Sequence, residues 1–429
     1  MEPLPVDILQ LQRRDPAAWS ALLARYPETS DVIVTAVVSE PLYSTTLAFP
    51  SRLASDCTHR IRRYILTLSG SSDPITFIGK QTNAAEARFY SLYGDPPGTA
   101  IPTCHYAHID GDDSWLVLDD VPDHYPPAAW LPRQVDGIVE TLARVHAARW
   151  NHNADMYGEL GATEPIIPHF IHRPAGPYTW NELQQAETAL FEEGPAAALS
   201  RHAIHNAGRL APYFLRAANG LVVMRDLGGW PGVMGESHLS AVADLLDDPV
   251  PMLAPLLELP VTLLHGAPYP SHWRLTLFDD SYLVDWSETQ IGPGVLDLMS
   301  FIEGYPLLQD RSRDADRGEP HLRVREISPI TEETLVDTYL LTLSAELSGR
   351  TSARAFRAAL PAARSLHVLL TWFPYFATWA NNMPDRYVWQ RVNRQSAANP
   401  TRYHDAPEEG MRLYLAGVFE RFLRACRSL

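Results

Sequence analysis

Hydrophobic and polar positions follow two different patterns along the chain, and the change comes at a proline-rich connector over residues 123–132. Before the connector, apolar and β-branched runs are short and lie between turn-forming residues, which is typical of strands. The predicted strands cover residues 32–38, 59–68, 75–80 and 115–120. Runs of this length predict a small antiparallel sheet.

Two helices are predicted within the same part of the chain. The first covers residues 16–26, and the second covers residues 85–93, where Phe89, Leu92 and Tyr93 recur on one helical face. The first 122 residues are therefore expected to form one lobe, built from the sheet and these helices.

After the connector, most segments have helical periodicity, and residues 135–150 place Ile138, Leu142, Val145 and Ala148 on one face. Further helices are predicted near residues 182–194, 237–247, 252–258, 331–347, 353–381 and 409–427. Residues 153–180 are rich in Pro, His and Gly and predict an irregular insertion. A short strand over 261–265 precedes a β-hairpin formed by 274–278 and 282–286. Residues 123–429 are thus expected to form a larger, mainly helical lobe of an α+β protein.

Composition places the chain among globular proteins of the cytoplasm. Of its 429 residues 46% are hydrophobic, and the formal net charge of −16 disfavours a nucleic acid partner. The three cysteines, Cys57, Cys104 and Cys426, are too few and too distant for a disulfide framework or a zinc site. No signal peptide pattern and no run of 18 apolar residues occurs, so neither export nor a membrane location is expected.

A single lysine, Lys80, stands among the 35 basic residues, at the end of the predicted strand 75–80. Glu86 follows six residues later, at the start of the next helix. A lysine on a strand, held by a carboxylate on a helix, is an arrangement that presents an ammonium group to nucleotide phosphates. A surface ion pair is the simpler alternative. A P-loop is excluded, because Pro74 and Gln81 occupy positions where that motif needs Gly and Ser or Thr.

Further along the chain the motifs form an ordered series. Lys80 and Glu86 are followed by LVLDDV at 116–121, LARVHAARW at 142–150, LLHGAPYPSHWRL at 263–275 and YLVDWSETQIGPGVLDL at 282–298. This series resembles the aminoglycoside phosphotransferase and choline kinase-like family, over about residues 30 to 300. The resemblance implies a two-lobed fold related to the protein kinases, and transfer of phosphate from ATP or GTP, with Mg²⁺, to a hydroxyl of a small molecule.

The resemblance also implies a role for each matching residue. Lys80 would contact the nucleotide phosphates, and Glu86 would orient it. Asp119, Asp120 and Val121 would lie at the hinge between the two lobes, where backbone groups bind the edge of the adenine base. Asp285 would hold Mg²⁺, His265 would brace the catalytic loop, Asp297 would accept bonds from loop amides, and His146 would be a packing residue.

Two departures lie in the catalytic loop, which reads HGDxxxxN in the family. Ala267 stands where the family has the aspartate that accepts the proton of the substrate hydroxyl, and His272 stands where it has the metal-binding asparagine. Loss of a general base typically costs about 10²- to 10⁴-fold in rate. A neutral imidazole is also a poor ligand for Mg²⁺, which prefers oxygen. Residues 31–69 contain no glycine, which weakens the expectation of a phosphate-covering loop.

Three functions therefore stay open at this point. The chain could be a phosphotransferase that acts on a small molecule, and its surplus of acidic residues would suit a cationic substrate. It could instead be a catalytically inactive binding or regulatory protein of the pseudokinase type, or a kinase-like fold used for elimination or cyclisation. Lesser signals are DDVPD at 119–123, which resembles a diphosphate-binding string, and the spacings His169/His172 and His202/His205. The aromatic segment 372–382 is expected to pack in the core or to line an acceptor pocket. The sequence leaves the oligomeric state open.

Overall fold

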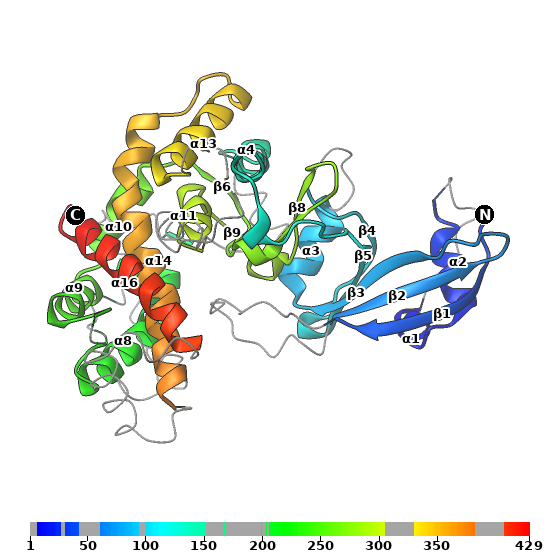
Figure 1. Cartoon of the computed structure of the whole chain (residues 1–429), viewed down its shortest axis with the longest axis horizontal. Helices are drawn as coiled ribbons and strands as arrows, with labels where there is room; N and C mark the ends of the chain where they lie inside the picture. Colours follow the sequence, from blue (N-terminus) through cyan, green and yellow to red (C-terminus); the bar gives the residue numbers. More distant parts are fainter. Residues whose placement is uncertain are drawn as a thin grey trace, which may run out of the picture.

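The computed structural model describes residues 7–26, 31–42, 61–93, 100–151, 166–167, 199, 203, 206–230, 232–304, 330–381 and 407–429. The predicted helix at 182–194, Cys57 and both histidine pairs lie outside the described residues, as does nearly all of the predicted insertion. Figure 1 shows two lobes, a sheet lobe and a helical lobe, with the two chain ends at opposite sides of the molecule.

A five-stranded antiparallel sheet forms the first lobe, in the spatial order β1-β2-β3-β5-β4. The strands are β1 (Val34–Pro41), β2 (Ile61–Leu68), β3 (Ile75–Thr82), β4 (Cys104–His108) and β5 (Ser114–Asp119). The four predicted strands are confirmed, whereas β4 was not predicted. Its sequence CHYAH lacks the apolar alternation of a strand, and pairing with β5 stabilises it at the edge of the sheet.

Helices cover both faces of this sheet. The helices α1 (Ile8–Gln12) and α2 (Pro16–Leu23) pack on one face, in a cluster that includes Trp19, Tyr64 and Trp115. The helix α3 (Ala84–Tyr93) packs on the other face. Since side chains alternate along a strand, successive residues of β3 belong to different faces.

The predicted face of α3 needs one correction. Phe89 and Tyr93 are buried, but Leu92 is 44% exposed. Glu86 and Tyr90 complete the buried face instead. A charged residue thus occupies a position where apolar periodicity predicts none, and its reason lies in the site described below.

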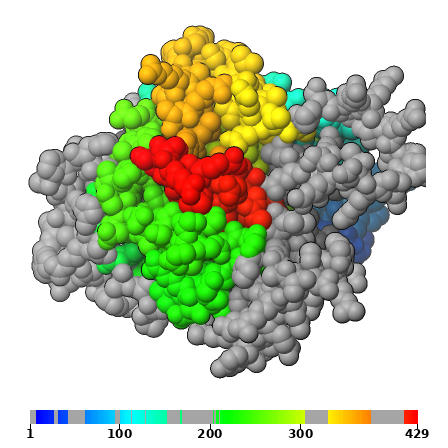
Figure 2. Space-filling view, turned by 60° about the vertical axis from the view of Figure 1, so that its left-hand side comes forward, coloured from blue at the N-terminus to red at the C-terminus, as the bar shows by residue number. Residues whose placement is uncertain are grey.

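Eight helices dominate the described part of the second lobe: α4 (Pro132–Ala148), α8 (Ala211–Asp226), α9 (Glu236–Asp247), α10 (Val250–Leu257), α11 (Val295–Gly304), α13 (Glu332–Glu346), α14 (Ala353–Asn381) and α16 (Pro407–Cys426). On α4, Ile138 and Leu142 are fully buried as predicted, whereas Ala148 is exposed at the end of the helix. Figure 2 shows α16 in red, lying across this lobe between the green and orange segments.

The long helix α14 packs closely against α8. The sequence pattern did not predict a helix over the residues of α8. Asn219 and Gly220 in the middle of α8 read as a turn signal. In the structure Gly220 has a packing role instead, because a Cβ there would lie 1.8 Å from the backbone oxygen of Phe373 on α14. On α14, Trp372, Phe373 and Phe376 are buried, so these three aromatic residues belong to the core.

Two small pairs of antiparallel strands lie where the lobes meet. The strand β6 (Val261–Leu264) pairs with β9 (Gln290–Pro293), and β7 (Trp273–Leu275) pairs with β8 (Ser281–Leu283). The predicted hairpin is therefore confirmed, with shorter strands. The expected two-lobed α+β architecture, with a small antiparallel sheet in one lobe and mainly helices in the other, is confirmed as well. The expected lobe boundary at residue 122 falls between β5 and α4.

None of the helices in the described part of the chain is long and apolar enough to cross a membrane. Cys104 and Cys426 are both free thiols, and burial raises the pKa of Cys104 to about 12 and that of Cys426 to about 11.

Candidate active site

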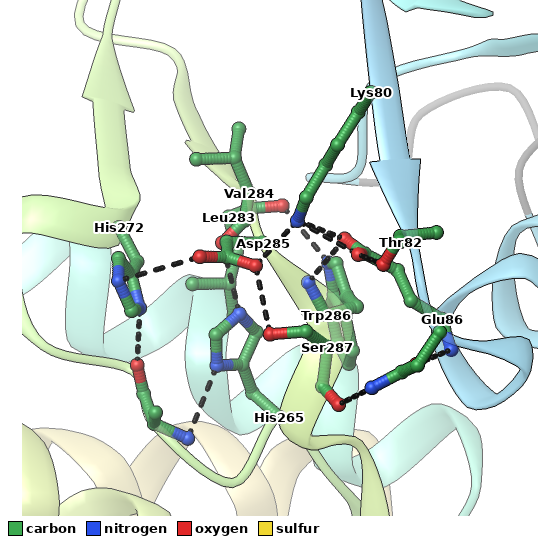
Figure 3. A network of polar contacts seen from close by, with 12 residues as sticks. Lys80, Thr82, Glu86, His265, His272, Leu283, Val284, Asp285, Trp286 and Ser287 are labelled. Atoms are coloured by element: carbon green, nitrogen blue, oxygen red, sulfur yellow. Dashed lines mark hydrogen bonds and ion pairs between the residues drawn. The ribbon is translucent and has the colours of Figure 1, made fainter. Parts of the chain in front are cut away.

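Lys80 lies at the contact between the two lobes (Figure 3). Strand alternation places its side chain on the α3 face of the sheet, where it is 8% exposed. Its Nζ lies 2.7 Å from Oε2 of Glu86 and 2.5 Å from Oδ1 of Asp285. The structure therefore brings together three residues that the resemblance assigned to one site, and residues 80 and 285 come from different lobes.

Glu86 is fully buried and hydrogen bonded on every side. It accepts hydrogen bonds from Lys80 and from the Thr82 hydroxyl, and its Oε1 also accepts the backbone N–H of Trp286 at 2.9 Å. The backbone N–H of Glu86 in turn donates to Oδ1 of Asn83 at 2.9 Å, a side-chain bond typical of the first turn of a helix. This network explains why a carboxylate is tolerated on the buried face of α3.

Two further contacts join α3 to the segment after Asp285. The amide of Asn83 donates to the backbone oxygen of Ser287 at 2.8 Å, and the ring of Phe89 stacks on Trp286 with centroids 3.9 Å apart. Sequence reasoning missed the roles of Asn83 and Trp286. Asn83 could have been found, because Asn directly before a helical segment is a preferred cap.

The charges of this cluster stabilise one another. Burial lowers the pKa of Lys80, but the carboxylates of Asp285 and Glu86 outweigh burial and raise that pKa above its ordinary value. Burial raises the pKa of Asp285, but the charge of Lys80 and the hydrogen bonds from Lys80 and Ser287 outweigh burial and hold that pKa well below its usual range. Lys80 is therefore charged and Asp285 ionised near neutral pH.

Asp285 has an unusual backbone conformation, with φ at +68°, in the left-handed region. The conformation ends β8 and turns the carboxylate toward Lys80, and the hydroxyl of Ser287 donates to its Oδ1 at 2.9 Å. Its second oxygen, Oδ2, lies 3.8 Å from Nε2 of His272. One oxygen of Asp285 thus faces Lys80, and the other faces the imidazole.

A buried aspartate, Asp297, organises the loop that leads to Ala267. It accepts the backbone N–H of His265 at 2.7 Å and that of Gly266 at 3.0 Å, and it lies 3.2 Å from Nε2 of His146. Gly266 adopts a φ of +87°, and a Cβ there would lie 2.1 Å from the backbone oxygen of Glu288. The packing of His146 and the bonds of Asp297 to loop amides are as expected for these residues.

His265 is held as a neutral imidazole by two backbone bonds. Its Nε2 donates to the carbonyl of Val284 at 3.0 Å, and its Nδ1 accepts the N–H of Ala267 at 3.3 Å. Burial, together with nearby His272, lowers the pKa of His265 to about 4. The ring therefore links the catalytic-loop position 267 to the residue before Asp285.

The two positions that depart from the family lie next to each other. Ala267 is 1% exposed, and its carbonyl lies 2.6 Å from Nδ1 of His272. Because a carbonyl can only accept, Nδ1 carries the proton and Nε2 presents a lone pair toward Asp285. Burial lowers the pKa of His272, which favours this neutral form.

The hinge residues make side-chain bonds that sequence reasoning did not foresee. Asp119 lies 2.6 Å from Nε2 of His105, and Asp120 binds Nε of Arg63 at 2.6 Å. Burial raises the pKa of Asp119, but the bonds to His105 and Thr103 bring it below its ordinary value. Val121 is half-buried and directly follows this pair. These bonds fix the two carboxylates, and the expected role of this segment as an adenine-binding hinge stays a prediction. The DDVPD string begins at the end of a strand, not on a helix.

A divalent cation of the kind the resemblance implies finds two candidate ligands here, the carboxylate of Asp285 and Nε2 of His272. Within the described ranges no group of three or more His, Cys, Asp or Glu residues could hold a metal ion. A carboxylate oxygen suits Mg²⁺, whereas an imidazole nitrogen suits Mn²⁺ or Zn²⁺ better. The residues therefore fit a cation whose remaining ligands are phosphate oxygens or water.

No protein-family model matches the chain, and no curated protein is similar to it. Solved structures of similar fold include an aminoglycoside phosphotransferase from Alicyclobacillus acidocaldarius, with 15% identity over 88% of this chain and 93% of that one, at a TM-score of 0.39. They also include an ethanolamine kinase from Plasmodium vivax, with 12% identity over 85% of this chain and 83% of that one, at a TM-score of 0.43. A choline kinase from Streptococcus pneumoniae has 11% identity over 91% of this chain and 92% of that one, at a TM-score of 0.35. These are the classes of protein that the sequence motifs resemble.

Proposed function

We propose that the chain is a nucleotide-dependent phosphotransferase that acts on a hydroxyl of a small molecule. The observation that carries this proposal is the pairing of Lys80 with Glu86 in one lobe and Asp285 in the other, at 2.7 and 2.5 Å. A buried ammonium between two carboxylates is costly to desolvate, and its burial at the lobe contact is consistent with binding of an anionic ligand there.

In this proposal each residue of the cluster has one task. Lys80 neutralises phosphate charge while Glu86 holds its stem in place, and Asp285, with His272, holds a divalent cation. When bound, that cation would neutralise charge on the phosphates. Phosphoryl transfer has a loose transition state that depends mainly on positioning and charge neutralisation, and these residues supply both. We take ATP or GTP as the donor and a cytoplasmic small molecule, such as a cationic secondary metabolite, as the acceptor.

A second candidate is supported by Ala267. Its methyl group cannot accept the proton of an acceptor hydroxyl, and the position is buried. A protein that binds nucleotide at Lys80 without transferring phosphate, as in a pseudokinase, would need no residue there. Elimination or cyclisation has no comparable observation in its favour.

Nucleotide binding is the property that the first two candidates share, so it is tested first. Isothermal titration of the full chain with ATP or GTP, with Mg²⁺ or Mn²⁺, should show binding at millimolar concentrations or below. The Lys80→Arg variant keeps the charge but replaces a compact ammonium by a planar group, and it should bind at least tenfold more weakly. Arg88→Lys is a matched control, because it lies on α3 outside the cluster. Equal binding by Lys80→Arg would remove Lys80 from the site.

A further inference from the structure

A cavity lies on the opposite face of the sheet from Lys80. It has a volume of about 330 Å³ and lies between the end of α1 and side chains of β1, β2, β3 and β5. Gly79 and Gln81 line it, and both flank Lys80 on β3, so alternation directs them away from the lysine. The volume is at the lower end of that of small-molecule sites.

Two arginines face this cavity without a carboxylate partner. Arg62 on β2 is held by Ser39, whose hydroxyl accepts from its Nε at 3.2 Å and from Nη2 at 3.1 Å. Arg14 follows α1 and adopts a φ of +67°. Neither guanidinium forms an ion pair with any residue in the described ranges.

The neighbouring arginine on the same strand behaves differently. Arg63 points to the other face of the sheet, where it pairs with Asp120 at 2.6 Å and with Glu40 at 3.2 Å. The two consecutive arginines of β2 therefore differ in their ion pairs. Arg63 pairs with two carboxylates, whereas Arg62 pairs with no carboxylate of the described residues. In a chain with a net charge of −16, an uncompensated pair of arginines at one cavity is a local reversal of charge.

The other polar groups of the cavity can also donate hydrogen bonds. They are the side chains of Gln12, Ser39, Tyr64 and Gln81, and no acidic residue lines the cavity. Asp113, which does not line the cavity, accepts a hydrogen bond from the Gln81 amide at 2.8 Å. Burial raises the pKa of the Tyr64 phenol, while the charges of Arg62 and Arg14 oppose this shift. The phenol thus lies within electrostatic reach of both guanidinium groups.

Gly79 forms part of the wall, since a Cβ there would lie 2.4 Å from the ring of Tyr64 and 2.9 Å from that of Trp115. Both rings are buried. The wall is therefore closely packed, and the groups that can form hydrogen bonds lie around it.

We propose that this cavity is a second ligand site, which binds the phosphate group of a small phosphorylated metabolite or inorganic phosphate. Guanidinium groups bind phosphate oxygens with two parallel hydrogen bonds, and hydroxyl and amide donors can bind the remaining oxygens. The site differs from the nucleotide site, because Arg62 is the register partner of Gly79 whereas Lys80 pairs with Ile61 and points to the other face. It does not depend on the proposed function.

Isothermal titration of the full chain with inorganic phosphate and with glycerol 3-phosphate, at low ionic strength, tests this proposal. We expect binding by the unaltered chain, at least tenfold weaker binding by the double variant Arg14→Gln/Arg62→Gln, and unchanged binding by Arg63→Gln. Tighter binding of the ester would identify a metabolite as the ligand, and equal binding would identify free phosphate. The Lys80→Arg variant separates the two sites, because it keeps the positive charge between Glu86 and Asp285 and should keep this binding while it weakens nucleotide binding.

A second variant guards against misfolding of the first. Ser39→Asp keeps both arginines and places a carboxylate beside the Arg62 guanidinium, so it too should weaken phosphate binding at least tenfold, with an unchanged circular dichroism spectrum. The proposal is overturned if the unaltered chain binds neither probe, if both cavity variants bind as the unaltered chain does, or if Lys80→Arg alone loses binding.

Discussion

The cluster around Lys80 and the loop from Ala267 to His272 lie close together, yet they differ in completeness. In the cluster every charged group has an oppositely charged partner within 2.8 Å, and Glu86 is hydrogen bonded on both oxygens. In the loop an alanine stands where the motif of the family that the sequence resembles has an acid, and the imidazole of His272 binds a backbone carbonyl.

This difference separates two requirements of phosphoryl transfer. Under the proposed function, the residues that would neutralise phosphate charge are present, whereas the residue that would accept a proton is absent. A loose transition state depends strongly on the first requirement and less on the second. The proposed function therefore predicts nucleotide binding, with a rate of transfer that depends on the loop. The predictions below test each half of this comparison, beginning with the largest expected effect.

Restoring the acid should change the rate most. We expect Ala267→Asp to raise nucleotide turnover by about 10²- to 10⁴-fold if the chain is a slow phosphotransferase, because a general base contributes about that much. Turnover is measured as release of ADP or GDP with water as acceptor. Ala267→Asn is the matched control, since it has the same size and no base. An equal effect of both variants would show that proton acceptance does not limit the rate.

Removing the lysine should affect stability as well as binding. Lys80→Met leaves Glu86 buried without its cation, and breaking a buried pair in this way costs about 3–5 kcal/mol. The free energy of unfolding in urea at pH 7 measures this. Lys80→Met/Glu86→Gln removes both charges and should recover part of the loss. No recovery in the double variant would contradict a direct interaction between the two side chains.

The loop should respond to acid through His265. Its folded pKa of about 4 lies below the ordinary value of 6.5, so protons bind the unfolded chain first as the pH falls. Stability is therefore fully present above pH 6.5 and declines toward pH 4, by about 3 kcal/mol for this group. Urea unfolding across this range measures the decline. His265→Gln should reduce it, and an identical pH dependence in that variant would assign the effect elsewhere.

The smallest effect concerns the choice of metal ion. Because Nε2 of His272 faces Asp285, the nucleotide complex should prefer Mn²⁺ to Mg²⁺, and His272→Asn should shift that preference toward Mg²⁺ by about tenfold. Titration of each ion into the chain with ADP, followed for Mn²⁺ by electron paramagnetic resonance, measures binding without turnover. An unchanged preference in the variant would exclude His272 as a ligand.

Much of the site was predictable because it depends on local order in the sequence. A lysine at a strand end, a carboxylate one helical turn into the next helix and an aspartate after a hairpin are each visible as patterns. The bonds of Asn83 to Ser287 and of Trp286 to Glu86 were not, because they join residues about 200 positions apart. Similarly, Leu92 was misplaced because apolar periodicity cannot show that Glu86 takes a buried position.

The helix α8 shows the opposite limit. Its Asn-Gly pair has the local chemistry of a turn, and only contact with α14 makes glycine the residue that fits a helix there. The cavity beside Arg62 was not predicted either, since it requires four strands and a helix to converge. Local patterns therefore predicted most of the elements, whereas β4, α8 and the contacts between distant elements were not predictable from them.

Lys80 is the single lysine of the chain, so its side chain is the one ε-amine available to acylating reagents. In the structure this amine is protonated, ion paired and 8% exposed, which protects it from reaction. Acylation of Lys80 requires the contact with Asp285 to open. The rate of labelling at this residue would therefore report how often the contact between Lys80 and Asp285, which joins the two lobes, is broken.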